Sequence, residues 1–175
     1  MHEDLEKKLV NDFPTIFKFY GGDPRETCMA WGMSCGDGWF DLIYDMCDRV
    51  DQLCKTHPKD VEVIADQVKE KFGGLRFYYH VNKKQNWFEK LNSKFHRFMG
   101  RHMWGRMAQK IDKFRRKFYL TLYEQIDEAI TEAEIQSYKT CEDCGTSGKR
   151  RPGGWVRTLC DQCEKEYQDG RNIKK

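Results

Sequence analysis

The sequence predicts an α+β protein with a small body, a protruding basic helical hairpin and a C-terminal zinc module of the zinc-ribbon or treble-clef type. Three observations predict this class: apolar residues at helical spacing, two alternating runs joined by Gly73-Gly74, and two Cys-x-x-Cys pairs near the end of the chain. A chain of 175 residues can bury one modest core with small attachments. We therefore assign the body to 1–82, the helical hairpin to 83–138, and the zinc module with its basic tail to 139–175.

The body is expected to contain two helices. A short amphipathic helix over 4–12 should end at Phe13-Pro14, because proline disfavours helical geometry in the residue before it. From Phe40 onward, apolar residues recur every three or four positions, which predicts a core-facing helix that ends near His57-Pro58. A glycine-rich passage over 31–39 separates the two helices.

The passage over 67–81 is predicted to form a β-hairpin. Apolar and polar residues alternate on both sides of Gly73-Gly74, and the two central positions of a tight hairpin turn favour positive φ. Residues 61–65 could add a strand, and a helix is the competing interpretation of Val68 to Lys71.

Helical spacing returns after Asn82. It predicts one helix over 84–99 and a longer one over 101–138. At about 1.5 Å per residue, the longer helix would reach ~57 Å if unbroken, so it must protrude from the body or kink near Gly105.

The two cysteine pairs have the spacing of a structural zinc site, with 15 residues between Cys144 and Cys160. One Zn²⁺ per chain would be held by Cys141, Cys144, Cys160 and Cys163. Four thiolates fill a tetrahedral ion and leave no position for an activated water. Two disulfides, free thiols or a redox pair are the alternatives.

Four further cysteines lie in the body, at Cys28, Cys35, Cys47 and Cys54. Cys47 and Cys54 share a face of the predicted helix, but two helical turns separate them by roughly 10 Å. We therefore favour buried free thiols that act as small apolar side chains, with a second metal site as the alternative.

Charge is segregated along the chain although the net charge is only +3. Residues 1–66 hold 7 basic and 14 acidic side chains, whereas residues 83–117 hold 12 basic and 2 acidic ones. An excess of this density implies an anionic partner: nucleic acid, an acidic protein groove or the acidic N-terminal region of the same chain. The residues expected to bind it are Lys90, Lys94, Arg97, Arg101, Arg106, Lys110, Lys113 and Arg116. The aromatic residues between these basic residues could belong to the same binding surface, or they could form the apolar core of the helical hairpin; the sequence favours neither.

Three passages, at 35–43 (Cys-Gly-Asp-Gly-Trp-Phe-Asp-Leu-Ile), 67–78 and 153–160, together resemble a family of small, largely uncharacterised phage and prophage proteins that end in a four-cysteine zinc motif. The resemblance covers the body and the tail but not the basic segment. It implies a phage accessory protein that acts in the cytoplasm of a bacterial host. The absence of a leader pattern or a long apolar run likewise predicts a soluble intracellular protein.

Catalysis is not expected. Asp37 and Asp41 are the only carboxylate pair that we consider as a candidate catalytic site. Asp37 is better interpreted as a helix N-cap or turn residue. We expect a binding protein with no small-molecule substrate and no membrane. Its first candidate function is inhibition of a host nucleic-acid-handling complex, such as a defence nuclease, in the manner of anti-CRISPR proteins. The alternative is direct DNA or RNA binding.

Overall fold

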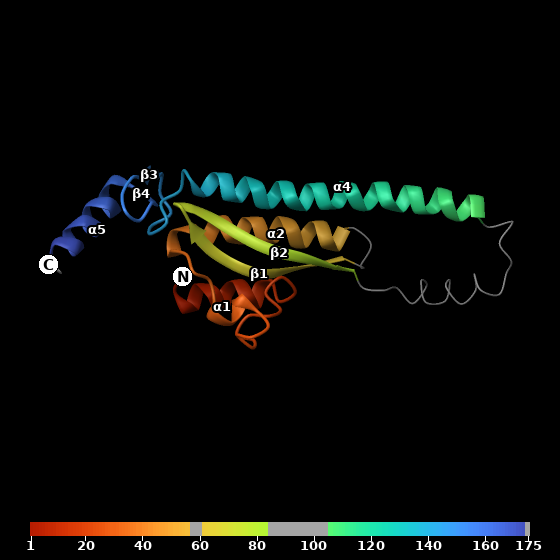
Figure 1. The fold of residues 1–175 in the computed structure, drawn as a ribbon, viewed down its shortest axis with the longest axis horizontal. Coiled ribbons are helices and arrows are strands. Elements are labelled where there is room, and N and C mark those ends of the chain that lie inside the picture. The colour runs from red at the N-terminus through yellow and green to blue at the C-terminus, as the bar shows by residue number, and fades with distance from the viewer. Residues whose placement is uncertain (57–60, 84–104, 174–175) are drawn as a thin grey trace.

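The computed structural model describes residues 1–56, 61–83 and 105–173, with side chains described for 1–56, 61–82 and 121–170 (Figure 1). Its helices and strands confirm the predicted α+β class. The elements are α1 (Glu3–Asp12), the 3₁₀ turns η1 (Cys28–Trp31) and η2 (Asp37–Trp39), α2 (Phe40–Thr56), β1 (Val61–Lys71), β2 (Gly74–Lys83), α4 (Gly105–Ser137), β3 (Lys149–Arg151), β4 (Arg157–Leu159) and α5 (Asp161–Ile173).

The two helices of the body lie close to where the sequence predicts them. α1 ends at Asp12, before Phe13-Pro14, and the Phe13 N–H closes the last turn on the carbonyl of Leu9. α2 buries the side chains at positions 43, 46, 47 and 50, which is the spacing of one helical face. In Figure 1 the β1–β2 hairpin lies between α1 on one side and α2 with α4 on the other.

The β1–β2 hairpin confirms the predicted pairing but not the predicted turn. Lys71 pairs with Gly74, so the two central turn residues are Phe72 and Gly73, with φ values of 54° and 79°. Gly74 is instead the first residue of β2. A β-carbon at Gly74 would clash with the ring of Tyr138, so close packing explains this glycine rather than turn geometry.

Residues 61–65 form the first half of β1 and not a strand of their own. A bulge between Ala65 and Gln67 shifts the register there, and the alternation then continues to Lys71. The helical alternative for 68–71 is therefore wrong. On its outer edge β1 is bridged by Ser34, whose N–H donates to the Val68 carbonyl and whose carbonyl accepts from the Glu70 N–H.

α4 starts at Gly105 and continues past the end of α2 (Figure 1). It therefore protrudes from the body, which is one of the two predicted outcomes. The predicted helix over 84–99 lies outside the described residues. The C-terminal half of α4 belongs to the body, because its apolar side chains share one core with α2 and the hairpin. The core includes Leu9, Phe17, Trp39, Ile43, Cys47, Val50, Val63, Val68, Leu75, Phe77, Leu122, Ile126, Ala129 and Ala133. Residues 121–137, which the sequence analysis placed in the helical hairpin, therefore pack into the core and attach α4 to the body.

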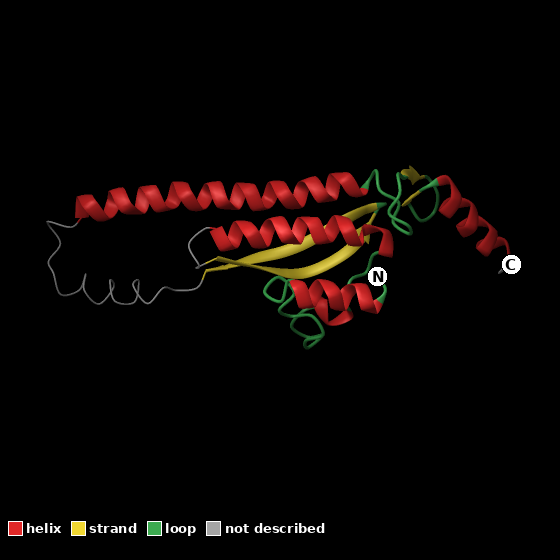
Figure 2. Cartoon of the chain, turned by 180° about the vertical axis from the view of Figure 1, so that it is seen from behind, coloured by secondary structure: helices red, strands yellow, loops and turns green. Residues whose placement is uncertain are grey.

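The C-terminal module follows α4 directly. β3 and β4 form a small antiparallel hairpin, and α5 starts immediately after Cys160. Figure 2 shows the loops of this module between the end of α4 and α5.

Candidate metal centre

The four predicted ligands converge on one point. The sulfur atoms of Cys141, Cys144, Cys160 and Cys163 all lie within 4.8 Å of one another, and those of Cys144 and Cys160 are 3.7 Å apart. A tetrahedral zinc with Zn–S bonds of 2.3 Å requires sulfur–sulfur distances of about 3.8 Å. The cluster therefore has the size and the donor set of a structural zinc site.

Each cysteine pair is presented by a tight local structure. In the first pair, the Cys141 carbonyl accepts from the Gly145 N–H at 2.9 Å, and the Cys141 N–H donates to the Thr146 carbonyl at 2.7 Å. In the second pair, α5 begins directly after Cys160, and the Cys163 N–H points at the Cys160 sulfur at 3.4 Å. Two local structures that are far apart in the sequence, at 141–146 and at 160–163, therefore present two thiols each.

The surroundings favour thiolates at two of the four sulfurs. The Cys163 N–H, followed by the Cys163 thiol, lowers the pKa of Cys160 to about 6. The hydroxyl of Thr146, followed by its backbone amide, lowers the pKa of Cys144. Burial raises the pKa of Cys141 and of Cys163. Four adjacent thiols cannot all ionise without a cation between them, and a divalent metal supplies that charge.

The first cysteine turn is docked on the glycine-rich passage of the body. The Gly38 N–H donates to the Glu142 carbonyl at 2.8 Å, and the Gly36 N–H donates to the Glu142 carboxylate at 3.1 Å. The indole N–H of the buried Trp39 donates to the Thr140 carbonyl at 2.9 Å. The glycine-rich passage, which suggested a carboxylate site, is therefore the surface on which the C-terminal zinc module (139–175), called the metal module from here on, docks.

The position of Asp37 corrects one detail of the sequence interpretation. It does not cap a helix, because the N-cap of η2 is Gly36; Asp37 is the first residue of this 3₁₀ turn, which confirms the second of its two predicted roles. Its carboxylate instead accepts the backbone N–H of His2 at 2.6 Å. Asp41 is exposed in the first turn of α2. The tie from Asp37 joins the start of α1 to the seat of the metal module.

Glu142 is a central residue that the sequence analysis did not single out. It is buried, its N–H donates to the Thr158 carbonyl, and its carboxylate accepts from Arg157 at 3.3 Å. Burial raises its pKa, and the Arg157 charge opposes that shift. The Arg157 guanidinium also pairs with Asp143. The only sequence signal was an acidic pair placed between two ligand cysteines.

The hairpin turn of the body makes the second contact with the metal module. The Thr158 hydroxyl donates to the Gly73 carbonyl, and a β-carbon at Gly73 would lie 3.3 Å from Val156. Nearby, the buried Ser137 hydroxyl accepts the Leu75 N–H at 2.8 Å. The three passages at 35–43, 67–78 and 153–160 therefore meet in space around the cysteine cluster.

The other four cysteines do not form a second cluster among the residues that the structure describes. Cys35 and Cys47 are buried, as expected of apolar thiols, and burial raises the pKa of Cys35 to about 12. Cys54 is half-buried. Cys28 is exposed, so the expectation of a buried thiol is wrong there; it begins η1 at the surface loop after α1.

The basic residues proposed to bind a partner are only partly placed. Lys90, Lys94, Arg97 and Arg101 lie outside the described residues. Arg106, Lys110, Lys113 and Arg116 lie on α4, in the part whose side chains are not described.

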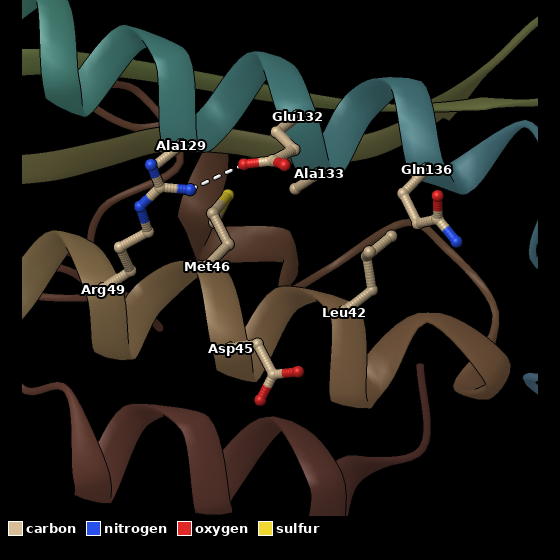
Figure 3. A pocket seen from close by; sticks show the side chains of 8 residues that line it. All are labelled: Leu42, Asp45, Met46, Arg49, Ala129, Glu132, Ala133 and Gln136. Carbon is tan, nitrogen blue, oxygen red and sulfur yellow. Dashed lines mark hydrogen bonds and ion pairs between the residues drawn. The ribbon is translucent and has the colours of Figure 1, made fainter.

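A groove of about 250 Å³ runs between α2 and α4 (Figure 3). Met46, Ala129 and Ala133 supply apolar lining, and an ion pair of 2.6 Å between Arg49 and Glu132 spans the groove. Asp45 and Gln136 add polar lining, and none of the four clustered cysteines lines the groove.

Comparison with known proteins returned no match to any family model, curated protein or solved structure. Nothing outside the sequence itself therefore supports the resemblance to phage proteins. Within the described part of the chain, no helix is long and apolar enough to cross a bilayer.

Proposed function

We propose that this chain is a zinc-stabilised binding protein that acts without catalysing a reaction. The four-thiol cluster carries the proposal, because ligation by four cysteines leaves a tetrahedral zinc no open position for water or substrate. The tempting carboxylate at Asp37 is engaged by the His2 backbone, and the glycines around it seat the metal module. Binding is the function that this arrangement supports best.

Nucleic acid is the partner that best matches the charge. Residues 83–117 carry 12 basic side chains against 2 acidic ones, and phosphate backbones attract such segments strongly at low salt. Further cations and exposed aromatic rings are found on the described surface beside the metal module. Direct binding of DNA or RNA therefore becomes our first candidate.

Inhibition of a host nucleic-acid-handling complex, such as a defence nuclease, is the second candidate. Residues 1–66 are acidic, with exposed Asp45 and Asp48 on α2, and this side of the body would repel a duplex. The same side could face a basic protein groove. In this role the chain would be a phage accessory protein of the bacterial cytoplasm.

Elemental analysis of the purified chain tests the zinc centre. We expect one zinc per chain, loss of zinc in Cys160→Ser, and retention in Cys28→Ser, whose thiol is exposed outside the cluster. Parent protein without zinc, or equal zinc in both variants, would contradict the proposed centre.

Oligonucleotide binding separates the two candidates. A direct binder should bind DNA or RNA alone, with an affinity that falls as salt rises. An inhibitor should bind a purified nuclease complex without nucleic acid and lose that binding when nucleic acid fills its site. Charge reversal at Lys94, Arg97, Arg101, Arg106 and Lys110 should weaken binding in either case and leave the body folded.

A further inference from the structure

Phe72 is an unusual residue for its position. It occupies the first central position of the β1–β2 turn with φ of 54°, a conformation that glycine or asparagine adopts with far less strain. Its side chain is 66% exposed and so adds little to the core. Folding alone therefore gives no reason for an aromatic residue here, and strained residues of this kind are often kept for binding.

A second exposed aromatic residue, Trp155, comes from the metal module to the same junction. Gly73 packs on Val156 and Thr158. Phe72 precedes Gly73 in the chain and Trp155 precedes Val156, so this contact brings the two aromatic residues to the same junction. Trp155 is 65% exposed at the tip between β3 and β4. Zinc binding would thus hold two large rings at one edge of the molecule.

The outer face of the β1–β2 hairpin continues from this junction with cations. Lys69 and Arg76 are cross-strand partners, and Lys71 and Tyr78 lie on the same face by the alternation of the strands. The Lys69 ammonium lies 5.1 Å from the Tyr78 ring centre, and that of Lys71 lies 5.7 Å from the Phe72 ring centre. Tyr78 is 42% exposed.

Tyr138 anchors two guanidinium groups beside this face. Arg76 and Arg150 lie 5.8 Å and 5.5 Å from its ring centre. Arg76 is paired with Glu134, whereas no described carboxylate lies within ion-pair distance of Lys69, Lys71 or Arg150. The face therefore keeps uncompensated positive charge next to exposed rings.

We infer that this surface, formed by Phe72, Trp155, Tyr78, Lys69, Lys71 and Arg150, is a binding site for single-stranded nucleic acid. Exposed rings provide stacking platforms for unpaired bases, and adjacent cations bind the phosphates between them. A duplex keeps its bases stacked on one another and cannot use the rings in this way. The inference rests on the proposed function and adds a second contact surface, on the metal module and the hairpin, to the basic residues 83–117.

Fluorescence anisotropy with the zinc-loaded full chain tests the inference. The probes are a short labelled oligothymidylate and the duplex of the same length. Phe72→Gly and Trp155→Ala should each weaken binding of the single strand roughly 5- to 150-fold, the usual loss for one stacked base. Trp31→Ala is the matched control, because Trp31 is a 76% exposed ring on η1 that is not one of the six residues of this surface. It should bind as the parent does.

The choice of Phe72→Gly separates binding from folding. Glycine accepts the positive φ without strain, so this variant should melt no earlier than the parent while it binds more weakly. A parent that binds neither probe would overturn direct nucleic-acid binding, the first candidate function, and this surface with it. A parent that binds, with both variants and the control unchanged, would overturn only this surface and move binding to residues 83–117. Equal or tighter binding of the duplex would overturn the assignment to single strands.

Discussion

Replacing Gly38 by alanine should displace the first cysteine turn, residues 141–145, from the body. A β-carbon at this position would clash with the Cys141 carbonyl and the Gly145 N–H, and would lie 2.7 Å from the Cys144 nitrogen. All three are backbone atoms of the first cysteine turn, so no side-chain rotation can relieve the clash. The turn as a whole must move away from η2.

The structure sets the size of the effect. The displacement would break the bonds from the Gly38 N–H, the Gly36 N–H and the Trp39 indole to residues 140–142. At about 1 kcal/mol for each intramolecular hydrogen bond, the free energy of unfolding should fall by roughly 3 kcal/mol. For a chain of this size, that corresponds to a loss of roughly 6 to 12 °C in Tm.

Thermal unfolding in excess zinc measures this change. Gly154→Ala is the control, because a β-carbon at Gly154 meets nothing within 4 Å, in the same module. Its Tm should stay near that of the parent. If Gly38→Ala melts with the parent, or if both variants lose the same amount, the first cysteine turn is not seated on Gly38 and the account of the glycine-rich passage is wrong.

Three further predictions follow from single contacts. Ser137→Ala leaves the Leu75 N–H without its buried acceptor and should lower the free energy of unfolding by about 1–3 kcal/mol in urea titrations; an unchanged midpoint would contradict this bond. Asp37→Ala removes one hydrogen bond from an exposed carboxylate, so it should cost at most about 1.5 kcal/mol and leave partner binding intact; a folded variant that no longer binds would show that Asp37 belongs to the binding site. Burial, followed by a hydrogen bond to Asp127, raises the pKa of Tyr79 to about 12. In the unfolded chain a tyrosine ionises at about pH 10, so the stability that Tyr79 contributes is complete below pH 10 and is lost as the pH rises towards 12. Between pH 10 and 12, Tyr79→Phe should therefore lose less stability than the parent in alkaline unfolding curves.

Several elements follow from local sequence alone. The end of α1 before Phe13-Pro14 is a steric consequence of proline, and the buried face of α2 follows from helical periodicity. The paired spacing of the cysteines restricts their chemistry enough to predict the four-cysteine cluster that the structure shows. The hairpin was also predictable, but its turn was misplaced by one residue, since sequence rules favour glycine over Phe72 at positive φ.

The long-range contacts between these local elements could not be predicted from the sequence. Periodicity acts over a few residues, whereas the bonds from Gly36 and Gly38 to Glu142 join positions more than a hundred residues apart. Such contacts depend on how α4 packs against α2, which no local pattern encodes. A helical and β-hairpin body with a four-cysteine site was predictable from the order of residues alone. Only the packed chain converted a suspected carboxylate site into the seat of that metal centre, because its backbone amides lie where the cysteine turn offers its carbonyl groups.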